Sequence, residues 1–184
     1  MRLAEPAKYF LGLVATVLFR VIPMPLPNLE PIMATALPFA KRMGPVAGAA
    51  FAFVALASWD LISGRLGLWT LYAGATYAVI GYGAGKFFAS RKLNLKNRVG
   101  FAAGATVIFD AATALVFGWQ FGQPLSVTVA GQVPFTAYHL LGNVLGAAIL
   151  TPAIEAVLAG SQESDAWATG RPSASMHAGS LRRH

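Results

Sequence analysis

Apolar residues fill most of this chain of 184 residues, and they gather into six long runs that polar and charged residues separate. A helix that crosses a bilayer needs about 20 apolar residues, each adding ~1.5 Å to its length. The third to sixth runs meet that length, whereas the second is short and is broken by Pro31 and Pro38. The six predicted helices cover residues 7–22, 29–40, 44–63, 68–88, 99–117 and 133–158.

Composition indicates the same class of protein. Hydrophobic residues make up 56% of the chain and charged residues 11%, whereas about a quarter of the residues of a soluble domain are charged. With a mean hydropathy of +0.58, these values predict an integral membrane protein. The absence of cysteine excludes disulfides, thiolate metal sites and thiol nucleophiles. The net charge of +7 then fits basic residues at cytoplasmic helix ends better than nucleic-acid binding.

The positions of the basic residues predict the topology. If both termini are cytoplasmic and all six runs span, every Lys and Arg except Arg20 and Arg65 lies on the cytoplasmic side. This asymmetry follows the positive-inside rule. It predicts an all-α, six-helix protein of the plasma or inner membrane, with both termini in the cytoplasm. Residues 1–158 form the predicted membrane domain, and the polar composition of residues 159–184 predicts a disordered cytoplasmic tail.

Two acidic residues occupy matching places in apolar runs. A shift of 50 positions aligns Asp60 with Asp110 and Trp69 with Trp119. The match is consistent with a duplicated unit, and transport folds often place their binding site between such repeats. It is equally consistent with chance similarity between two helices rich in Ala and Gly.

Most polar side chains of the predicted spans lie toward one end, which is the outer side of the bilayer in this topology. A charge at mid-bilayer costs at least ~2.5–3.5 kcal/mol, so such residues usually face the interior of the bundle and mark function. We therefore expect an outward-facing polar pocket with an aromatic rim, suited to a cationic or hydrogen-bond-rich small molecule. The expected lining residues are Glu30, Asp60, Trp69, Tyr72, Asp110 and one helical stripe of Gln132, Thr136, His139 and Asn143.

Several of these residues also have a structural interpretation. Asp60 could be solvated or act as a cap at the interface, and Glu30 could complement the dipole of a helix N-terminus. His139 could be a core histidine that bonds to a carbonyl group. Trp69 fits a belt of interfacial aromatic residues as well as it fits a pocket wall. The proline-rich residues 23–31 are a further expected part of the site, because irregular backbone at membrane depth needs a cavity or a protein cover.

Four segments follow one another along the chain: PNLEPIM (27–33), LPFAKR (37–42), SWD (58–60) and QVPFTAYHLLGN (132–143). In this order they resemble the S components, the substrate-binding subunits, of energy-coupling-factor (ECF) vitamin transporters. The resemblance is closest to a subgroup of undefined substrate and covers roughly residues 1–158.

The resemblance implies six helices that bind a vitamin or related micronutrient from the outer side, and it adds Asn28 to the expected site. It also implies docking on a membrane coupling subunit driven by two ATPases on other chains, with no enzyme activity, cofactor or metal in this chain. One departure is that the first predicted helix lacks the Ala-xxx-Ala pair that such subunits often use for docking.

Two other classes of function stay open at this point. An intramembrane enzyme would use Asp60, Asp110 and His139 to bind a metal or to transfer protons, although no metal-ligand spacing occurs within one predicted helix. A structural or assembly protein without a ligand would keep these side chains and Glu30 apart, or turn them toward lipid.

Overall fold

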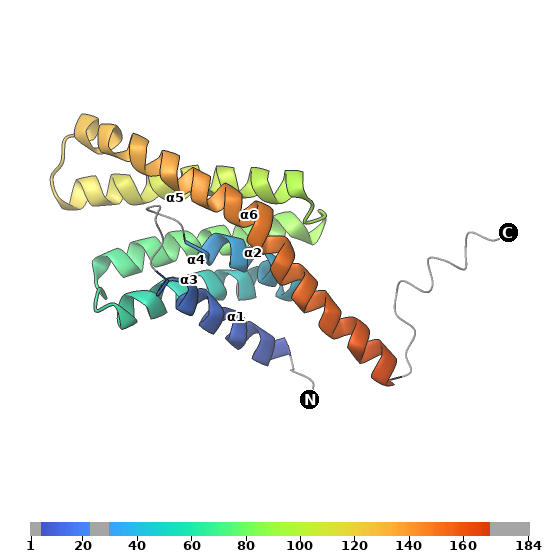
Figure 1. Cartoon of the computed structure of the whole chain (residues 1–184). Coiled ribbons are helices and arrows are strands. Elements are labelled where there is room, and N and C mark those ends of the chain that lie inside the picture. Colours follow the sequence, from blue (N-terminus) through green and yellow to red (C-terminus); the bar gives the residue numbers. More distant parts are fainter. Residues whose placement is uncertain (1–4, 23–29, 170–184) are drawn as a thin grey trace.

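The computed structural model describes residues 5–22 and 30–169, and of residues 160–169 it describes the backbone alone. In this part of the chain every regular element is an α-helix, which confirms the all-α prediction. The helices in Figure 1 are α1 (Glu5–Phe19), α2 (Ile32–Met43), α3 (Pro45–Ile62), α4 (Leu68–Ala89), α5 (Leu95–Gln120) and α6 (Leu125–Thr169).

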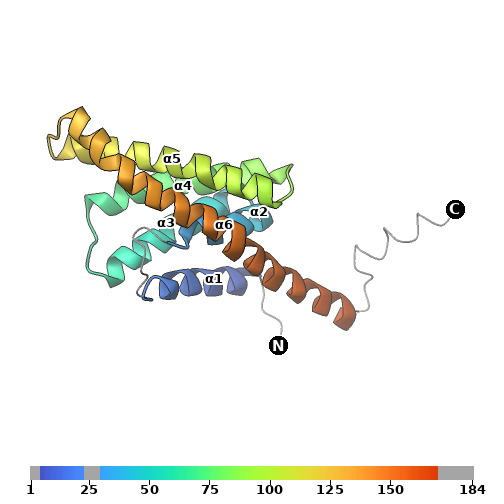
Figure 2. The same cartoon turned by 45° about the horizontal axis from the view of Figure 1, so that its top comes forward.

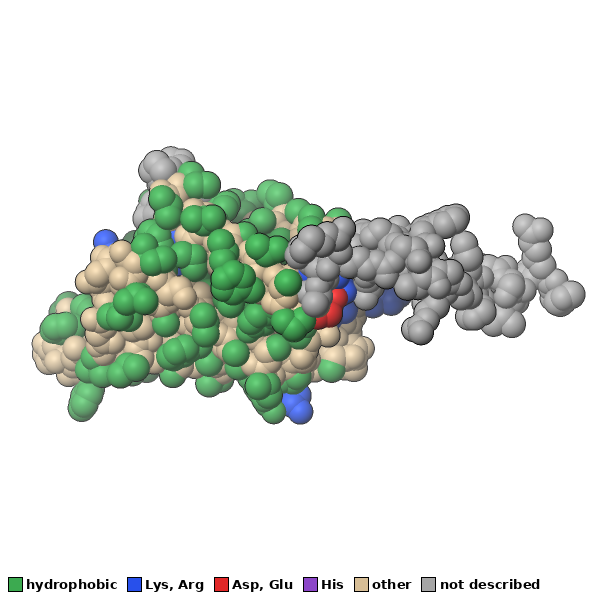
Figure 3. All heavy atoms as spheres, turned by 90° about the horizontal axis from the view of Figure 1, so that it is seen from below, with side chains coloured by type: hydrophobic (Ala, Val, Ile, Leu, Met, Phe, Trp, Pro, Cys, Tyr) green, Lys and Arg blue, Asp and Glu red, His purple; other side chains and the backbone are tan. Residues whose placement is uncertain are grey.

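The helices have the length and the surface of a membrane protein. Three of them are long and apolar enough to cross a membrane, namely α3, α5 and the Leu125–Ala159 part of α6. α1 and α2 have 15 and 12 residues, fewer than the about 20 that a bilayer requires. On the face shown in Figure 3, hydrophobic side chains spread across the described surface and charged side chains are few. An apolar exterior of this extent indicates contact with lipid.

α2 lies among the other helices of the bundle, as Figures 1 and 2 both show. It packs mainly against α3, α4 and α6, and all of residues 32–40 are buried. A helix that is hydrophobic on every side is stable when other elements enclose it. This enclosure explains how an apolar run too short to span by itself is accommodated.

α3 and α4 form the most extensive helix pair. A Cβ atom added to Gly48 would lie 2.6 Å from the carbonyl oxygen of Gly81, so no side chain fits there. Gly85 approaches the backbone of Pro45 in the same way. Glycines therefore bring the two backbones into direct contact. The chain enters α3 through Gly44, whose φ of 91° lies in the left-handed region that favours glycine.

A proline inside α2 frees a carbonyl group that α6 supplies with a donor. Pro38 has no N–H to bond the Ala34 carbonyl four residues earlier in the helix. The Thr151 hydroxyl of α6 donates to that oxygen at 2.8 Å. The buried backbone acceptor is thus satisfied from a neighbouring helix.

The same arrangement joins α6 to α5. Pro152 frees the Ala148 carbonyl, and Arg98 Nη2 of α5 donates to it at 3.2 Å. α6 then continues beyond the predicted end at residue 158 as far as Thr169, and this end projects from the bundle in Figures 1 and 2. Residues 170–184, the remainder of the predicted tail, lie outside the described residues.

Charged side chains join three helices at one end of the bundle. Arg42 Nε donates to Glu5 Oε2 at 2.6 Å. Arg42 Nη1 also donates to the Leu158 carbonyl of α6 at 3.3 Å. The hydrogen bond from Arg42 lowers the pKa of Glu5 to about 2. Close by in the sequence, Lys41 Nζ lies 3.9 Å from Glu155 Oε1. The contacts tie α1, α2 and α6 together at the end where α1 begins.

Candidate functional site

Two polar contacts join α5 and α6 like rungs of a ladder. His139 Nδ1 lies 2.7 Å from Asp110 Oδ1, and Asn143 Nδ2 donates to Thr106 Oγ1 at 2.9 Å. Thr106 and Asp110 are four residues apart on α5, and His139 and Asn143 are four residues apart on α6. The two contacts therefore lie about one helical turn apart along the α5–α6 interface. All four side chains are at most 2% exposed. We call Thr106, Asp110, His139 and Asn143 the α5–α6 ladder.

Glu30, two residues before α2, connects this ladder to α4 and to the segment that follows α1. Its Oε2 lies 3.1 Å from Arg20 Nη2, just past the end of α1, and its Oε1 accepts a hydrogen bond from the Tyr77 hydroxyl of α4. The same Oε1 lies 3.6 Å from His139 Nε2. Polar groups from five parts of the chain therefore form one buried polar cluster, which consists of Arg20, Glu30, Tyr77 and the α5–α6 ladder.

Four buried atoms of this cluster have no hydrogen-bond partner among the described residues. They are two nitrogens and two oxygens: Arg20 Nη1, His139 Nε2, Asp110 Oδ2 and Asn143 Oδ1. Leaving a buried polar atom unpaired costs about 1–3 kcal/mol. Such a group of atoms is typical of a place where water, an ion or a ligand completes the hydrogen bonding.

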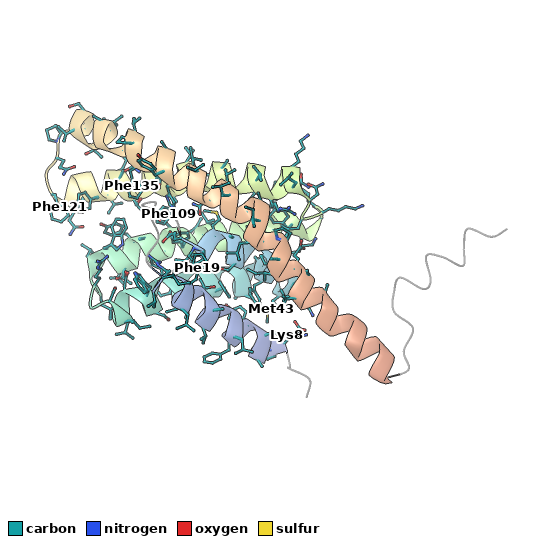
Figure 4. The ribbon with its side chains drawn as sticks, viewed as in Figure 1. Lys8, Phe19, Met43, Phe109, Phe121 and Phe135 are labelled. Atoms are coloured by element: carbon teal, nitrogen blue, oxygen red, sulfur yellow. The ribbon has the colours of Figure 1, made fainter. Side chains whose placement is uncertain are left out.

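Aromatic rings enclose the histidine from two helices. The rings of Phe109 on α5 and Phe135 on α6 each have their centroid 5.7 Å from that of His139, in edge contacts. Figure 4 labels both phenylalanines where α5 and α6 run past each other. The Tyr77 ring packs on Phe109 with centroids 4.3 Å apart. These contacts restrict the orientation of the imidazole and surround the polar groups with apolar surface.

Asp60 belongs to a separate hydrogen-bonded group. Its Oδ2 accepts a hydrogen bond of 2.7 Å from the Thr70 hydroxyl, which in turn accepts the backbone N–H of Gly67. The Asp60 carbonyl accepts the N–H of Arg65 at 2.7 Å. These contacts close the turn between α3 and α4, with the Asp60 carboxylate as the acceptor of the Thr70 side chain. The sequence-based expectation placed Asp60 with Asp110, but the structure gives the two side chains different partners.

The remaining expected residues border these groups or lie outside them. Gln132 Nε2 donates to Thr136 Oγ1 at 3.1 Å on the part of α6 that precedes His139. Trp69 and Tyr72, at the start of α4, pack edge to face with centroids 5.2 Å apart. Asn28 and the proline-rich residues 23–29 lie outside the described residues.

Three members of the buried polar cluster, Arg20, Tyr77 and Thr106, were not predicted as site residues. Arg20 was identified as one of two basic residues on the outer side, yet it pairs with Glu30, and its guanidinium carbon lies 5.1 Å from the centre of the Trp59 ring. Its isolation from the other basic residues was the available signal. The signal at Tyr77 was weaker, because tyrosines also serve as interfacial aromatic residues in membrane helices.

The chemistry of the cluster is that of polar recognition. It offers a guanidinium, two carboxylates, an imidazole, a phenol and an amide inside an apolar enclosure, where hydrogen bonds are electrostatically stronger than in water. Within residues 5–22 and 30–159, whose side chains the structure describes, no group of three or more His, Asp and Glu side chains is placed to hold a metal ion.

Comparison of the chain with protein-family models, curated proteins and solved structures finds no match.

Proposed function

We propose that this chain is the membrane-embedded substrate-capture subunit of an ECF-type transporter, which binds a small vitamin-like or cationic micronutrient from the outer side of the plasma or inner membrane. The observation that supports this proposal most is the buried polar cluster with its four unpaired atoms. Charged groups inside a membrane bundle are expensive and usually functional. In this proposal the unpaired donors and acceptors bind the substrate.

The topology that goes with this function has six spans and two cytoplasmic termini. The ion pair of Glu5 with Arg42 and that of Lys41 with Glu155 then lie at the cytoplasmic end, in agreement with the positive-inside rule. Arg20 follows α1 at its other end. The substrate would therefore meet the Arg20 side of the buried polar cluster first.

A structural protein without a ligand is the main competing interpretation, and the arrangement of Glu30, Asp110 and His139 argues against it. That interpretation expects these side chains and Asp60 to be apart or turned to lipid. Contacts of 2.7 and 3.6 Å link the three inside the bundle, whereas Asp60 bonds to Thr70 in a separate group. A cluster with a purely structural role would also be expected to satisfy its own polar atoms, and this one leaves four unpaired.

Uptake by such a subunit requires partners on other chains: a membrane coupling subunit and the ATPases that drive it. α1 offers a surface for the coupling subunit, because Phe10, Leu11 and Leu18 are exposed along it. The lack of an Ala-xxx-Ala pair on α1 means that larger side chains would form this contact. In this proposal the chain itself is not an enzyme and needs no cofactor.

The proposal is tested by identifying small molecules that co-purify with the protein. Wild type, Asp110→Asn and Glu30→Gln would be purified from the same membranes in mild detergent, and their extracts compared by mass spectrometry. We expect one compound enriched with wild type and reduced at least ~10-fold in both variants, because truncating one partner of a buried charge pair costs about 2–5 kcal/mol.

The matched control is Asp60→Asn. Asp60 is also a buried aspartate, 4% exposed, but it bonds to Thr70 within its own hairpin. This variant should keep the compound at the wild-type level. Equal amounts of every compound in wild type, Asp110→Asn and Glu30→Gln would contradict the proposed function.

A further inference from the structure

Four exposed basic side chains surround the turn between α4 and α5. They lie in the last turn of α4, in the turn itself and in the first turn of α5: Lys86, Arg91, Lys92 and Lys96. The chain carries no acidic residue between Asp60 and Asp110, so no opposite charge interrupts this group. We call these four residues the α4–α5 basic patch.

The patch differs from the other basic residues at its end of the bundle. Gly85 of α4 approaches the backbone of Pro45, which begins α3, so the patch lies at the end where Lys41 and Arg42 pair with carboxylates. Among the side chains that the structure describes, no carboxylate lies within ion-pair distance of the patch. Neighbouring positive charges without a counter-charge repel one another, and an anionic partner would relieve that repulsion.

Exposed apolar side chains border the patch on α4. Val79 and Tyr82 are 70% and 45% exposed, and they lie about two turns and one turn before Lys86 on the same face of the helix. Lys86 Nζ lies 5.7 Å from the centre of the Tyr82 ring, and the guanidinium carbon of Arg91 lies 4.4 Å from the centre of the Phe87 ring. The cations therefore rest on aromatic rings, where a helix surface that contacts lipid meets water.

This combination of charge and apolar surface selects the kind of partner. On α5, Leu95 is 56% exposed directly beside Lys96, so apolar surface adjoins the patch from both helices. An amphiphile with an anionic head group fits such a surface, because its head pairs with the cations while its acyl chains cover the apolar side chains. An acidic segment of a soluble protein would pair with the cations alone and would leave the apolar surface uncovered.

We propose that the α4–α5 basic patch binds the head group of an anionic phospholipid, whose acyl chains pack along Val79 and Tyr82 of α4 and Leu95 of α5. The lipid supplies the negative charge that the described part of the protein does not provide here. It also joins the end of α4 to the start of α5, the helix that carries Thr106 and Asp110 of the ladder. This inference requires only that the chain lies in a membrane, and it does not depend on the proposed transport role.

The test compares the lipids that the purified full-length protein retains. Wild type would be placed in nanodiscs with equal amounts of phosphatidylglycerol and phosphatidylcholine that have identical acyl chains, and its bound lipids would be identified by native mass spectrometry after release. We expect at least ~10-fold more bound phosphatidylglycerol, because each Lys or Arg beside an anionic lipid contributes roughly fivefold in affinity. Inorganic phosphate added at constant ionic strength should not change this ratio.

Two double variants of equal net charge locate the site. Arg91→Gln with Lys92→Gln removes two charges of the patch and should lower the preference for phosphatidylglycerol at least ~5-fold. Lys41→Gln with Arg65→Gln removes the same charge outside the patch and should keep the wild-type preference.

Three results would overturn the proposal. Equal retention of both lipids by wild type would do so, and an acidic surface of a partner protein would then be the better candidate. An equal loss of preference in the two double variants would show that net charge, and not this patch, attracts the lipid. Displacement of the lipid by inorganic phosphate would show that the patch binds a phosphate group without its acyl chains.

Discussion

His139 contacts both carboxylates of the buried polar cluster, with Nδ1 2.7 Å from Asp110 and Nε2 3.6 Å from Glu30. Replacing the imidazole by an apolar side chain would leave both carboxylates without this partner. Removing one partner of a buried charged pair typically destabilises a protein by about 3–5 kcal/mol. We expect His139→Leu to lower the free energy of unfolding by this amount, measured by denaturation in mixed detergent micelles.

A double substitution separates the contact from general loss of packing. Asp110→Leu combined with His139→Leu removes both partners of the 2.7 Å contact, so its cost should be clearly below the sum of the two single costs. Gln132→Leu is the control, since its bond to Thr136 lies on one helix and is partly exposed, and it should cost at most ~1 kcal/mol. Strict additivity of the two ladder substitutions would show that the contact contributes nothing.

At this scale the sequence predicted part of the site. An acid within an apolar run is a sound signal, and it identified Glu30 and Asp110, which the structure brings to His139. The same signal selected Asp60, whose partner Thr70 lies only ten residues away on the next helix. An apolar pattern cannot distinguish an acid bonded within its own hairpin from one bonded across the bundle, because both must be buried.

Among the helices, α2 depends most on its neighbours. Its Pro38 leaves the Ala34 carbonyl without an intrahelical donor, and the fully buried Thr151 of α6 replaces that donor. Thr151→Val keeps the shape of the side chain but removes the hydroxyl. We expect it to lower the free energy of unfolding by about 1–3 kcal/mol, the cost of a buried unsatisfied group.

Restoring the missing backbone donor should rescue this loss. Pro38→Ala returns an N–H that can bond the Ala34 carbonyl within α2. The combination of Pro38→Ala with Thr151→Val should therefore be more stable than Thr151→Val alone, and Thr151→Ser should stay close to wild type. If Pro38→Ala does not improve the Thr151→Val background in the same denaturation assay, the hydroxyl does not act through this carbonyl.

At the scale of helices, the sequence predicted which helices exist better than it predicted where each one begins and ends. The runs at 44–63 and 68–88 agree closely with α3 (Pro45–Ile62) and α4 (Leu68–Ala89). The run at 133–158 is shorter than α6, which begins at Leu125 and passes through Pro134 and Pro152. Hydropathy falls at polar positions such as Thr128 although the helix continues. A proline inside the pattern does not end the helix here, and a donor from α5 satisfies the carbonyl that Pro152 frees.

The whole molecule has two chemically different ends. One end carries the ion pairs of Arg42 with Glu5 and of Lys41 with Glu155. Arg20 follows α1 at its opposite end and reaches Glu30 in the buried polar cluster. If the exposed basic residues Arg91 and Lys92 between α4 and α5, and Lys96 in the first turn of α5, also face the cytoplasm, then the Arg20 side of the buried polar cluster faces the outer side. The orientation in the membrane thus decides from which side a substrate can arrive.

The absence of cysteine makes this orientation directly measurable, since any introduced cysteine is the only reactive thiol. Arg65→Cys and Gln123→Cys place exposed thiols in the turns after α3 and α5, and Lys92→Cys places one after α4. In intact cells, a membrane-impermeant maleimide should label positions 65 and 123 almost completely. Position 92 and a cysteine added before Met1 should react only after the membrane is opened.

Labelling of the added N-terminal cysteine in intact cells, with the other sites as expected, would mean that α1 and α2 do not both span. Labelling of Lys92→Cys from outside would show the opposite orientation. The Arg20 side of the buried polar cluster would then face the cytoplasm, which would rule out capture of a substrate from the outer side.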